Sequence, residues 1–289
     1  MEKIAVFSVV YPEVEKYFSD FFKSLEIQTF SNFELVLFND GFKNLDKYIS
    51  NSPIKKTVIS CHNTWSNIRI QGIKWLYNND FDYVVFADAD DYSSSNRIQI
   101  VTDLLSRYDL VCNDFHIFRD GENTSIPFLS KRLKEGDSVT AKSIFDKNIL
   151  GSNVGARMDA IISVLEYIPA DVIAFDWLLF SLSLLQGANC IFTDKTHCYY
   201  RQHPNNVASL LDVTNQQITK GVMVKKQHYT ALGSKYIEYK EASNQFTEIL
   251  NKMQDNEYAE LYCRAVREKL PMNQLWWEMI KTEKELGLC

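Results

Sequence analysis

Residues 83–91 read YVVFADADD, an apolar run that passes directly into three carboxylates within four residues. The apolar part predicts a strand that is buried on both faces of a sheet. Asp88, Asp90 and Asp91 follow at its carboxyl end, where open α/β sheets bind their ligands. Carboxylates this close repel one another, and a hard divalent cation, Mg²⁺ or Mn²⁺, would relieve the repulsion. An acidic turn that caps a helix beginning near Asn96 is the alternative.

Length and composition narrow the class of protein. The chain has 289 residues, enough for one large α/β domain or for one domain with an appendage. Its formal net charge of -6 disfavours a nucleic-acid-binding protein, which normally has a basic face. We find no run of about 18 apolar residues and therefore expect no transmembrane helix. The start, MEKI, reads as a strand rather than a signal peptide, and the 6 cysteines form no C-x-x-C pair, so we expect reduced thiols in a cytoplasmic protein.

The first 97 residues alternate between strand and helix patterns. We expect strands at 4–10, 33–38, 57–60 and 83–87, and helices at 13–28, 45–49 and 66–77. This alternation predicts a mostly parallel central sheet with right-handed crossovers and flanking helices.

After residue 97 the pattern is less regular. We expect helices at 98–106, 140–147 and 175–185, strands at 110–118 and 190–193, and a polar loop or hairpin at 119–138. From about residue 211 the chain is rich in Lys, Glu and Gln, and its spacing predicts a few helices that end in NQLWWE at 273–278. Because no low-complexity linker precedes this tail, we expect it to dock on the sheet domain.

Several segments taken together resemble the family 2 glycosyltransferases, which have the GT-A fold. The segments are SVVYP (8–12), SLEIQTF (24–30), NDGF (39–42), NTWSNIRIQG (63–72), DADD (88–91), FDW (175–177) and YYRQHPNN (199–206). In the family, DADD corresponds to the metal motif, FDW to the segment with the catalytic base, and YYRQHPNN to a Y-R-x-H-x-x-N motif. Each segment alone is a weak signal, but their order and spacing over residues 4–209 are specific.

The resemblance implies a Rossmann-like α/β fold of the GT-A type with a C-terminal helical extension. It places the glycosyltransferase domain at 1–210, with a nucleotide-binding half at 1–97 and an acceptor-binding half at 98–210, and the extension at 211–289. The implied activity is metal-dependent, inverting transfer of a sugar from a nucleotide-sugar donor, with UDP favoured, to a saccharide or lipid-linked acceptor. Bacterial surface polysaccharide synthesis is the implied setting, with peripheral contact at the inner face of the membrane and a homodimer as further expectations.

The resemblance also assigns the central roles in the site. Asp90 would bind Mn²⁺ or Mg²⁺, with His203 completing the metal shell, and Asp88 would face the donor. Asp176 would be the general base that takes the proton of the acceptor hydroxyl. It stands at the start of an apolar helix, where an ionised side chain is costly without a purpose, although a helix N-cap is the ordinary role of such an Asp. Asp91 could bind the metal, the sugar hydroxyls or the backbone of the following helix.

The remaining predicted contacts are assigned by position in the same segments. Nucleotide-sugar contacts fall to Pro12, Glu13, Asp40, Asn63, Arg69, Ala89 and Arg201, and weaker acceptor-side contacts to Gly151, Ser152, Asn153 and Trp177. Arg201 and His203 are expected in a loop after the last strand. The chain departs from the family in its short first loop, in Phe42 where a small polar residue is usual, and in Phe175 where the family has Glu.

Two other functions remain open at this point. A sugar-phosphate nucleotidyltransferase also uses a metal and paired carboxylates, but it usually has a Gly-rich basic loop after the first strand, and residues 11–15 read YPEVE. A non-catalytic nucleotide-sugar-binding protein could keep the fold. Processive synthases carry a Q-x-x-R-W motif, whose Arg is missing from QLWW at 274–277. We expect Trp276 and Trp277 to pack the tail on the core, with contact to a lipid-linked acceptor or a partner as the alternative.

Overall fold

The first strand shows how the sheet is buried. In β1 (Ile4–Val10), Ala5 and Phe7 belong to one hydrophobic cluster, whereas Val6 and Val10 belong to another. Successive side chains of a strand point to opposite faces, so both faces of the sheet are covered. The predicted strands are continuous apolar runs because the side chains on both faces of the sheet are buried.

The computed structural model describes residues 2–120, 125–203, 206, 213–271 and 273–288. β1 pairs in parallel with β2 (Glu34–Asn39) and with β4 (Tyr83–Phe86), and β2 pairs in parallel with β3 (Lys55–Ser60). The intervening helices are η1 (Pro12–Val14), α1 (Glu15–Glu26), α2 (Leu45–Ile49) and α3 (Trp65–Asn78). The predicted alternation of strands and helices is confirmed, and the carboxyl ends of β1, β2 and β4 meet at one edge.

The second half of the domain widens the sheet with strands of both directions. The strand order is β3-β2-β1-β4-β9-β6-β10-β5, and β9 pairs antiparallel with both β4 and β6. The further strands are β5 (Tyr92–Ser93), β6 (Leu110–Phe118), β7 (Ile126–Pro127), β8 (Ser138–Val139), β9 (Val154–Arg157) and β10 (Cys190–Arg201). The helical elements are α4 (Arg97–Leu105), η2 (Leu129–Lys131), α5 (Met158–Ile162), η3 (Leu165–Tyr167) and α6 (Phe175–Leu185).

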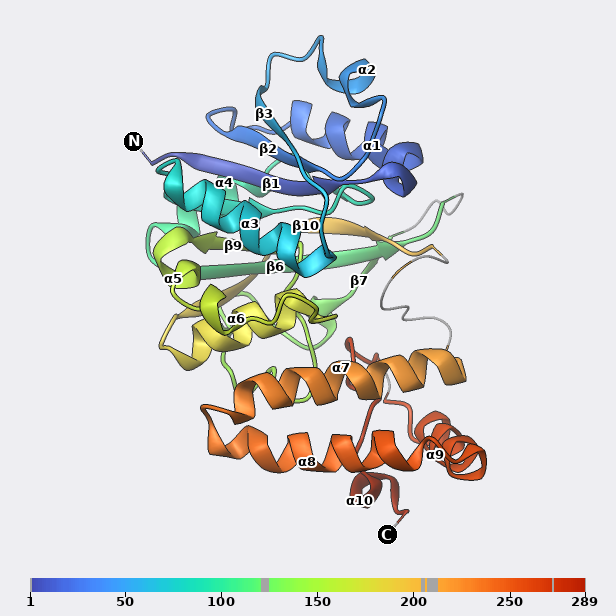
Figure 1. Ribbon diagram of the computed structural model, residues 1–289. Coiled ribbons are helices and arrows are strands. Elements are labelled where there is room, and N and C mark those ends of the chain that lie inside the picture. Colours follow the sequence, from blue (N-terminus) through green and yellow to red (C-terminus); the bar gives the residue numbers. More distant parts are fainter. Residues whose placement is uncertain (1, 121–124, 204–205, 207–212, 272, 289) are drawn as a thin grey trace.

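Helices cover both faces of this sheet (Figure 1). Phe18 of α1, Leu45 of α2 and Val101 of α4 pack on one face. Ile68 of α3 and Leu178 of α6 pack on the other. Gly155 of β9 shows how close the packing is, because a Cβ at this position would lie 2.2 Å from a methyl carbon of Val101. The predicted α/β fold with flanking helices is confirmed.

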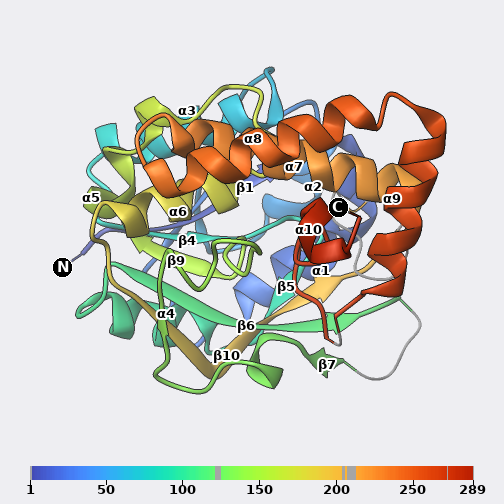
Figure 2. The ribbon, with the colours of Figure 1, turned by 90° about the horizontal axis from the view of Figure 1, so that it is seen from below.

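The C-terminal tail docks on the sheet domain as expected. Its helices are α7 (Asn215–Gly233), α8 (Ile237–Lys252), α9 (Asn256–Glu268) and α10 (Glu283–Leu286). α7 packs against α6, and α8 runs beside α7 on the outer side (Figures 1 and 2). Among the described residues, no helix has both the length and the apolar character needed to cross a membrane. The predicted domain boundary after residue 210 lies outside the described residues.

The prediction that the tail helices end in 273–278 is wrong. This segment lies between α9 and α10 and is not helical, and Trp277 has a left-handed backbone with φ of 67°. It returns to the sheet domain, where Trp276 forms an isolated β-bridge with Asn148. Tertiary contacts therefore override the helical pattern of this part of the tail.

Two further predicted elements differ from the structure. Residues 140–147 form turns and bends instead of a helix, and the carbonyls of Ile144 and Phe145 accept hydrogen bonds from the side chains of Trp177 and Tyr229. The last strand does not stop at residue 193. It continues past an irregularity between Thr193 and His197 and pairs with β6 as far as Arg201.

Candidate active site

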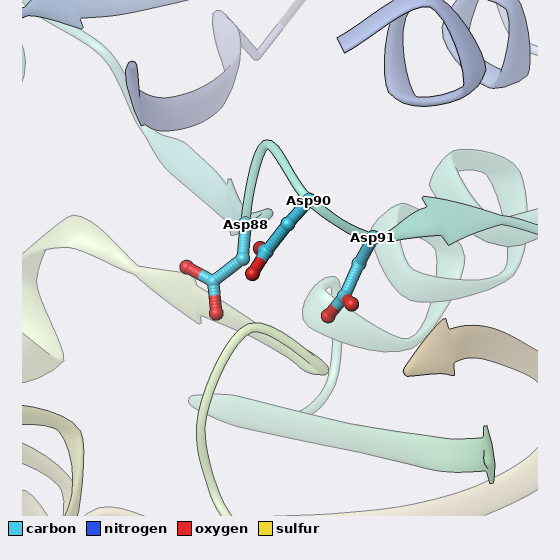
Figure 3. A group of neighbouring side chains, drawn as sticks. All are labelled: Asp88, Asp90 and Asp91. Carbon is cyan, nitrogen blue, oxygen red and sulfur yellow. The ribbon is translucent and has the colours of Figure 1, made fainter. Parts of the chain in front are cut away.

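Three carboxylates stand on the loop that leaves β4. We call Asp88, Asp90 and Asp91 the acid edge. One ligand oxygen from each lies within 4.8 Å of the others, and Figure 3 shows the three side chains on the same side of the loop. α4 begins later, at Arg97, and its N-cap residue Asn96 makes no side-chain cap. The acid edge therefore does not cap that helix, and the alternative of an acidic capping turn is wrong.

The electrostatics of the acid edge suit a hard cation. Burial raises the pKa of Asp88 to about 6, with Asp90 adding to the rise and Arg69 opposing it. Burial and the two neighbouring carboxylates raise the pKa of Asp91 well above its ordinary value. Within the described part of the chain, Asp91 Oδ2 has no hydrogen-bond partner. A divalent cation bound among these oxygens would remove the repulsion, so the residues fit Mn²⁺ or Mg²⁺.

His203 lies next to the acid edge. Its Nε2 is 3.0 Å from Asp90 Oδ2, and its ring stacks on Tyr17 with centroids 5.1 Å apart. An imidazole nitrogen thus joins the carboxylate oxygens as a potential ligand for a divalent metal. The next two residues of the sequence motif, 204 and 205, lie outside the described residues.

A cavity of about 170 Å³ opens in front of the acid edge. Its charged lining residues are Asp88, Asp90, Asp176 and Arg69, and Ala89 lies among them. Its aromatic lining residues are Tyr11, Trp65, Phe115, Phe175, Tyr200, Trp276 and Trp277. The lining therefore combines charged groups with aromatic rings, which suits a ligand that carries both phosphates and a ring.

Asp176 lines the same cavity and is the second residue of α6. The N-cap of α6 is Ala174, so Asp176 is not the helix cap that its sequence position suggested. Its side chain is 32% exposed. Burial raises its pKa, and Arg69 opposes the rise. A partly exposed carboxylate with a raised pKa, facing a cavity, has the features of a general base.

Arg69 of α3 connects the two groups of carboxylates. Its Nη2 donates to Asp88 Oδ1 at 3.3 Å, and its Nε lies 3.9 Å from Asp176 Oδ1. The guanidinium lies 4.1 Å from the centroid of the Trp65 ring. Its buried Nη1 has no hydrogen-bond partner among the described residues, so this donor is available to a ligand.

Arg201 holds the acid edge but does not reach the cavity. It ends β10, contrary to the expected loop, and its side chain is 3% exposed. Its backbone N–H donates to Asp91 Oδ1 at 2.9 Å, and its Nε donates to the carbonyl of Asp90 at 2.9 Å. The guanidinium also pairs with Asp20 and Asp120. The predicted contact between Arg201 and the donor is therefore replaced by a supporting role.

The predicted acceptor-side residues divide into two groups. Gly151 and Ser152 line the cavity, and a Cβ on Gly151 would lie 3.8 Å from Asp176 Oδ2. Asn153 is fully buried and its side chain binds the backbone of the same turn. Trp177 is also fully buried, with its indole N–H donating to the carbonyl of Ile144 at 2.8 Å. Asn153 and Trp177 are therefore core residues, and the prediction that they contact the acceptor is wrong.

The remaining predicted donor contacts lie outside the lining of this cavity. Pro12, Glu13 and Asn63 are exposed. Asp40 follows β2 at the same edge of the sheet, with its Oδ1 3.0 Å from His62 Nδ1. Phe42, the departure noted in the sequence, is buried in the core beside Phe18.

Two groups of residues were missed by sequence reasoning. Arg97 is almost fully buried, and its guanidinium donates to the carbonyls of Phe86 and Ser152, which joins β4 to the acceptor-side turn. The aromatic residues Tyr11, Trp65 and Tyr200 lie within the segments that resembled the family, so their positions were available as a signal. Trp276 and Trp277 were expected to pack the tail on the core, and their burial confirms this, but their place in the lining of the cavity was not predicted.

The fold and the site together define a glycosyltransferase with the GT-A fold. The family model described as glycosyl transferase family 2 matches residues 5–158. Because this match covers more than half of the 289 residues, the chain belongs to glycosyl transferase family 2. None of the curated proteins compared with the chain matches it significantly in sequence.

Solved structures share this fold. S. aureus TarS 1-349 in complex with UDP-GlcNAc has a TM-score of 0.62 and 16% identity, over 93% of this chain and 76% of that chain. The mannosyltransferase PcManGT from Pyrobaculum calidifontis, in complex with GDP-Man and Mn²⁺, has a TM-score of 0.59 and 11% identity, over 93% and 76% of the two chains. A longer S. aureus TarS chain is covered over 43% of its length, with a TM-score of 0.57. At these identities the likeness establishes the fold.

Proposed function

We propose that this protein is a metal-dependent, inverting glycosyltransferase that uses a nucleoside diphosphate sugar as donor. The acceptor would be a hydroxyl group of a saccharide or of a lipid-linked saccharide. The observation that carries the proposal is that Asp88, Asp90 and Asp176 line one cavity, with Arg69 between the donor-side carboxylate and the base. This arrangement supplies the two groups that the reaction needs, one for the departing diphosphate and one for the acceptor proton.

The donor side would be formed by the acid edge and its neighbours. Asp90 and His203 would hold Mn²⁺ or Mg²⁺, and a bound cation stabilises the negative charge of a departing diphosphate as a Lewis acid. The Nη1 of Arg69, which has no hydrogen-bond partner in the part of the chain that the structure describes, would donate to a phosphate oxygen. UDP-linked sugars are the favoured donors, with support from the fold shared with the TarS structure that contains UDP-GlcNAc.

The acceptor side would be organised around Asp176. The acceptor oxygen forms a bond to the anomeric carbon while the bond from that carbon to the diphosphate oxygen breaks. The hydroxyl proton moves to Asp176, whose raised pKa makes it a stronger base than an ordinary carboxylate. Attack from the face opposite the leaving group inverts the anomeric configuration.

The proposal extends to the organisation of the chain and its setting. We place the nucleotide-binding half at 1–97, the acceptor-binding half at 98–210 and the helical extension at 211–289. The cavity supports a joint role for these parts, since Asp88, Asp176 and Trp276 line it together. Surface polysaccharide synthesis, with a lipid-linked acceptor reached at the membrane surface, is the setting that we favour.

A thermal-shift panel tests the donor side directly. The purified protein is heated with UDP-, GDP-, CMP- and dTDP-linked sugars, with and without Mn²⁺. We expect one nucleotide class to raise the Tm, and to raise it further with Mn²⁺, because a ligand at 100 times its Kd stabilises the native state by about 2.7 kcal/mol. If none of these donors raises the Tm or is hydrolysed, the proposal is wrong. Release of pyrophosphate from a nucleoside triphosphate and a sugar phosphate would instead establish a nucleotidyltransferase.

A further inference from the structure

The tail of the chain contributes an aromatic surface to the candidate active site. Trp276 and Trp277 line the cavity together with Phe115 and Tyr200, and we call these four residues the aromatic wall. Trp276 packs edge-on against Phe115 and Tyr200, with ring centroids 5.3 and 5.2 Å apart. Both tryptophans lie far beyond residue 158, where the family match ends. The region that the family model matches therefore does not include Trp276 and Trp277.

The segment that carries the two tryptophans is fixed to the sheet domain. Asn148 N–H donates to the carbonyl of Trp276 at 2.9 Å. Glu278 accepts two hydrogen bonds from Arg132, at 2.5 and 2.9 Å, and a third from the backbone N–H of Leu275. Figure 2 shows the chain between α9 and α10 turning back toward β6 and β7. The wall is thus a built surface whose rings are held in place before any ligand arrives.

Trp277 has a backbone conformation that is unfavourable for a bulky residue. Its φ of 67° lies in the left-handed region, which glycine adopts readily and bulky side chains rarely do. Such outliers persist only where the surrounding structure enforces them, and they gather at ligand sites. The side chain is 6% exposed, and the cavity is lined in part by it. The left-handed backbone therefore indicates that the surrounding contacts, which include Gly221 of α7, hold Trp277 in this place.

The charges around the cavity restrict what can lie against the wall. Among the lining residues that the structure describes, Arg69 has the one positive charge, and Asp88 and Asp176 share it. A second phosphate-rich ligand on this side would meet carboxylates without a free cation to balance it. The wall is flanked by apolar residues, including Ile149 and Leu150. An uncharged ring with an apolar C–H face fits this surface, and a polyol phosphate does not.

We infer that the aromatic wall binds the sugar ring of the acceptor and selects an uncharged pyranoside over a phosphate-bearing acceptor. The inference rests on the proposed function, because it takes Asp176 as the base that receives the acceptor proton. Gly151 also lines the cavity, and because a Cβ at this position would lie 3.8 Å from Asp176 Oδ2, the missing side chain leaves space at the proposed base. A ring stacked on Trp277 would present a hydroxyl to Asp176, and the aromatic face would hold the ring by dispersion and C–H contacts.

The first test uses the unaltered protein and a panel of acceptors. Nucleotide release is measured with the donor found by thermal shift, and with p-nitrophenyl pyranosides or sn-glycerol 3-phosphate as acceptor. We expect at least one neutral pyranoside to accelerate release and to yield a glycosylated product. Faster release with sn-glycerol 3-phosphate than with any neutral pyranoside would overturn the inference. Donor hydrolysis without any acceptor reports on the proposed function alone. Failure of the proposed function can therefore be distinguished from failure of the inference about the aromatic wall.

The second test uses variants of the wall. Trp277→Ala and Trp277→Gly both remove the ring, and we expect each to raise the acceptor KM about tenfold and to increase the fraction of donor lost to water. Trp276→Phe keeps a ring in the packed position and should show a smaller rise. Trp75→Phe is the matched control, because Trp75 packs on Phe81 away from the cavity lining.

Two outcomes of the variant test would contradict the inference. An unchanged acceptor KM in Trp277→Gly, the variant that removes the ring without backbone strain, would show that the wall does not bind the acceptor. A rise in the donor KM without a rise in the acceptor KM would assign the wall to the donor sugar.

Discussion

The acid edge and the aromatic wall face the same cavity, but they are built in different ways. The three residues of the acid edge lie within a stretch of four residues after β4, so a short pattern in the sequence contains them. The aromatic wall joins side chains from β6, β10 and the segment before α10, which meet through tertiary packing. On the proposed function, the metal-binding carboxylates would be encoded in one short segment, whereas acceptor selection would depend on the docking of the tail.

The two regions also differ in what stabilises them. The acid edge gathers negative charge at a buried place, and Arg201 holds its backbone from behind. The wall is apolar and is anchored by hydrogen bonds and by the ion pair of Arg132 with Glu278. Changes at the acid edge should therefore affect the rate of the chemical step, and changes at the wall should affect use of the acceptor.

The largest expected effect is at the base. Asp176→Asn keeps the shape of the side chain but cannot take a proton, so we expect transfer to fall about 10²- to 10⁴-fold. Nucleotide release in the presence of acceptor measures the loss, and the Tm checks that the fold survives. Asp171→Asn, the same change at an exposed position before α6, is the control. Transfer retained at the normal rate in Asp176→Asn would remove Asp176 from the role of base.

The next effect tests the metal-binding role of the acid edge. Asp90→Asn should reduce transfer about 10²- to 10³-fold, because one charged ligand is lost where charge develops. It should also abolish the additional Tm increase that Mn²⁺ gives with donor. Asp103→Asn on the surface of α4 is the control. A full Mn²⁺ response in Asp90→Asn, or full activity after removal of metal by EDTA, would contradict this role.

The contrast between the acid edge and the aromatic wall explains which features could be predicted from the sequence and which could not. The strands of the first half, the acid edge and the position of Asp176 depend on local patterns of polarity, and the structure has them where they were expected. Trp276 and Trp277 could not be placed in this way, since their position depends on contacts with Asn148 and Arg132 far along the chain.

The errors in the sequence predictions have similar physical causes. In residues 140–147, side chains of Trp177 and Tyr229 donate to the carbonyls of Ile144 and Phe145, so helical spacing was misleading there. Arg201 was expected to bind phosphate, but Asp20 and Asp120 neutralise it. Trp177 lies next to the base in the sequence, yet successive residues of a helix point in different directions, and it faces the core.

A smaller effect concerns the strain at Trp277 and sharpens the description of the wall. Trp277→Gly and Trp277→Ala lose the same ring, but only glycine is at ease with a φ of 67°. We expect the glycine variant to be more stable than the alanine variant by about 1 kcal/mol in denaturant unfolding. Equal stabilities would mean that the left-handed backbone is not maintained in the alanine variant.

The smallest expected effect is on the pH dependence of the free energy of unfolding, through the buried Lys225. Lys225 of α7 is buried and donates to the carbonyl of Ile280 at 2.6 Å, and burial lowers its pKa to about 7. Asp146 and Glu285 oppose this shift, whereas Lys281 and Lys147 add to it. The unfolded chain therefore binds more protons than the folded chain between about pH 7 and pH 10.5, and Lys225 makes stability rise with pH in this window.

Lys225→Met isolates this contribution, because it keeps the length of the side chain and removes the titrating group. Relative to the variant, the original protein should gain up to about 1.4 kcal/mol of stability per pH unit above pH 7. Denaturant unfolding at pH 7, 8 and 9 measures the difference. Parallel stability curves for the two proteins would show that Lys225 does not titrate in this window.

Acceptor saturation curves test the division of labour between the two regions most directly. The same neutral pyranoside is varied with the original protein, Asp176→Asn and Trp277→Ala, at saturating donor and Mn²⁺. We predict that Asp176→Asn lowers kcat by about 100-fold or more, whereas Trp277→Ala chiefly raises the acceptor KM, by about tenfold. Equal losses of kcat in both variants, with no change in the acceptor KM of Trp277→Ala, would contradict the account.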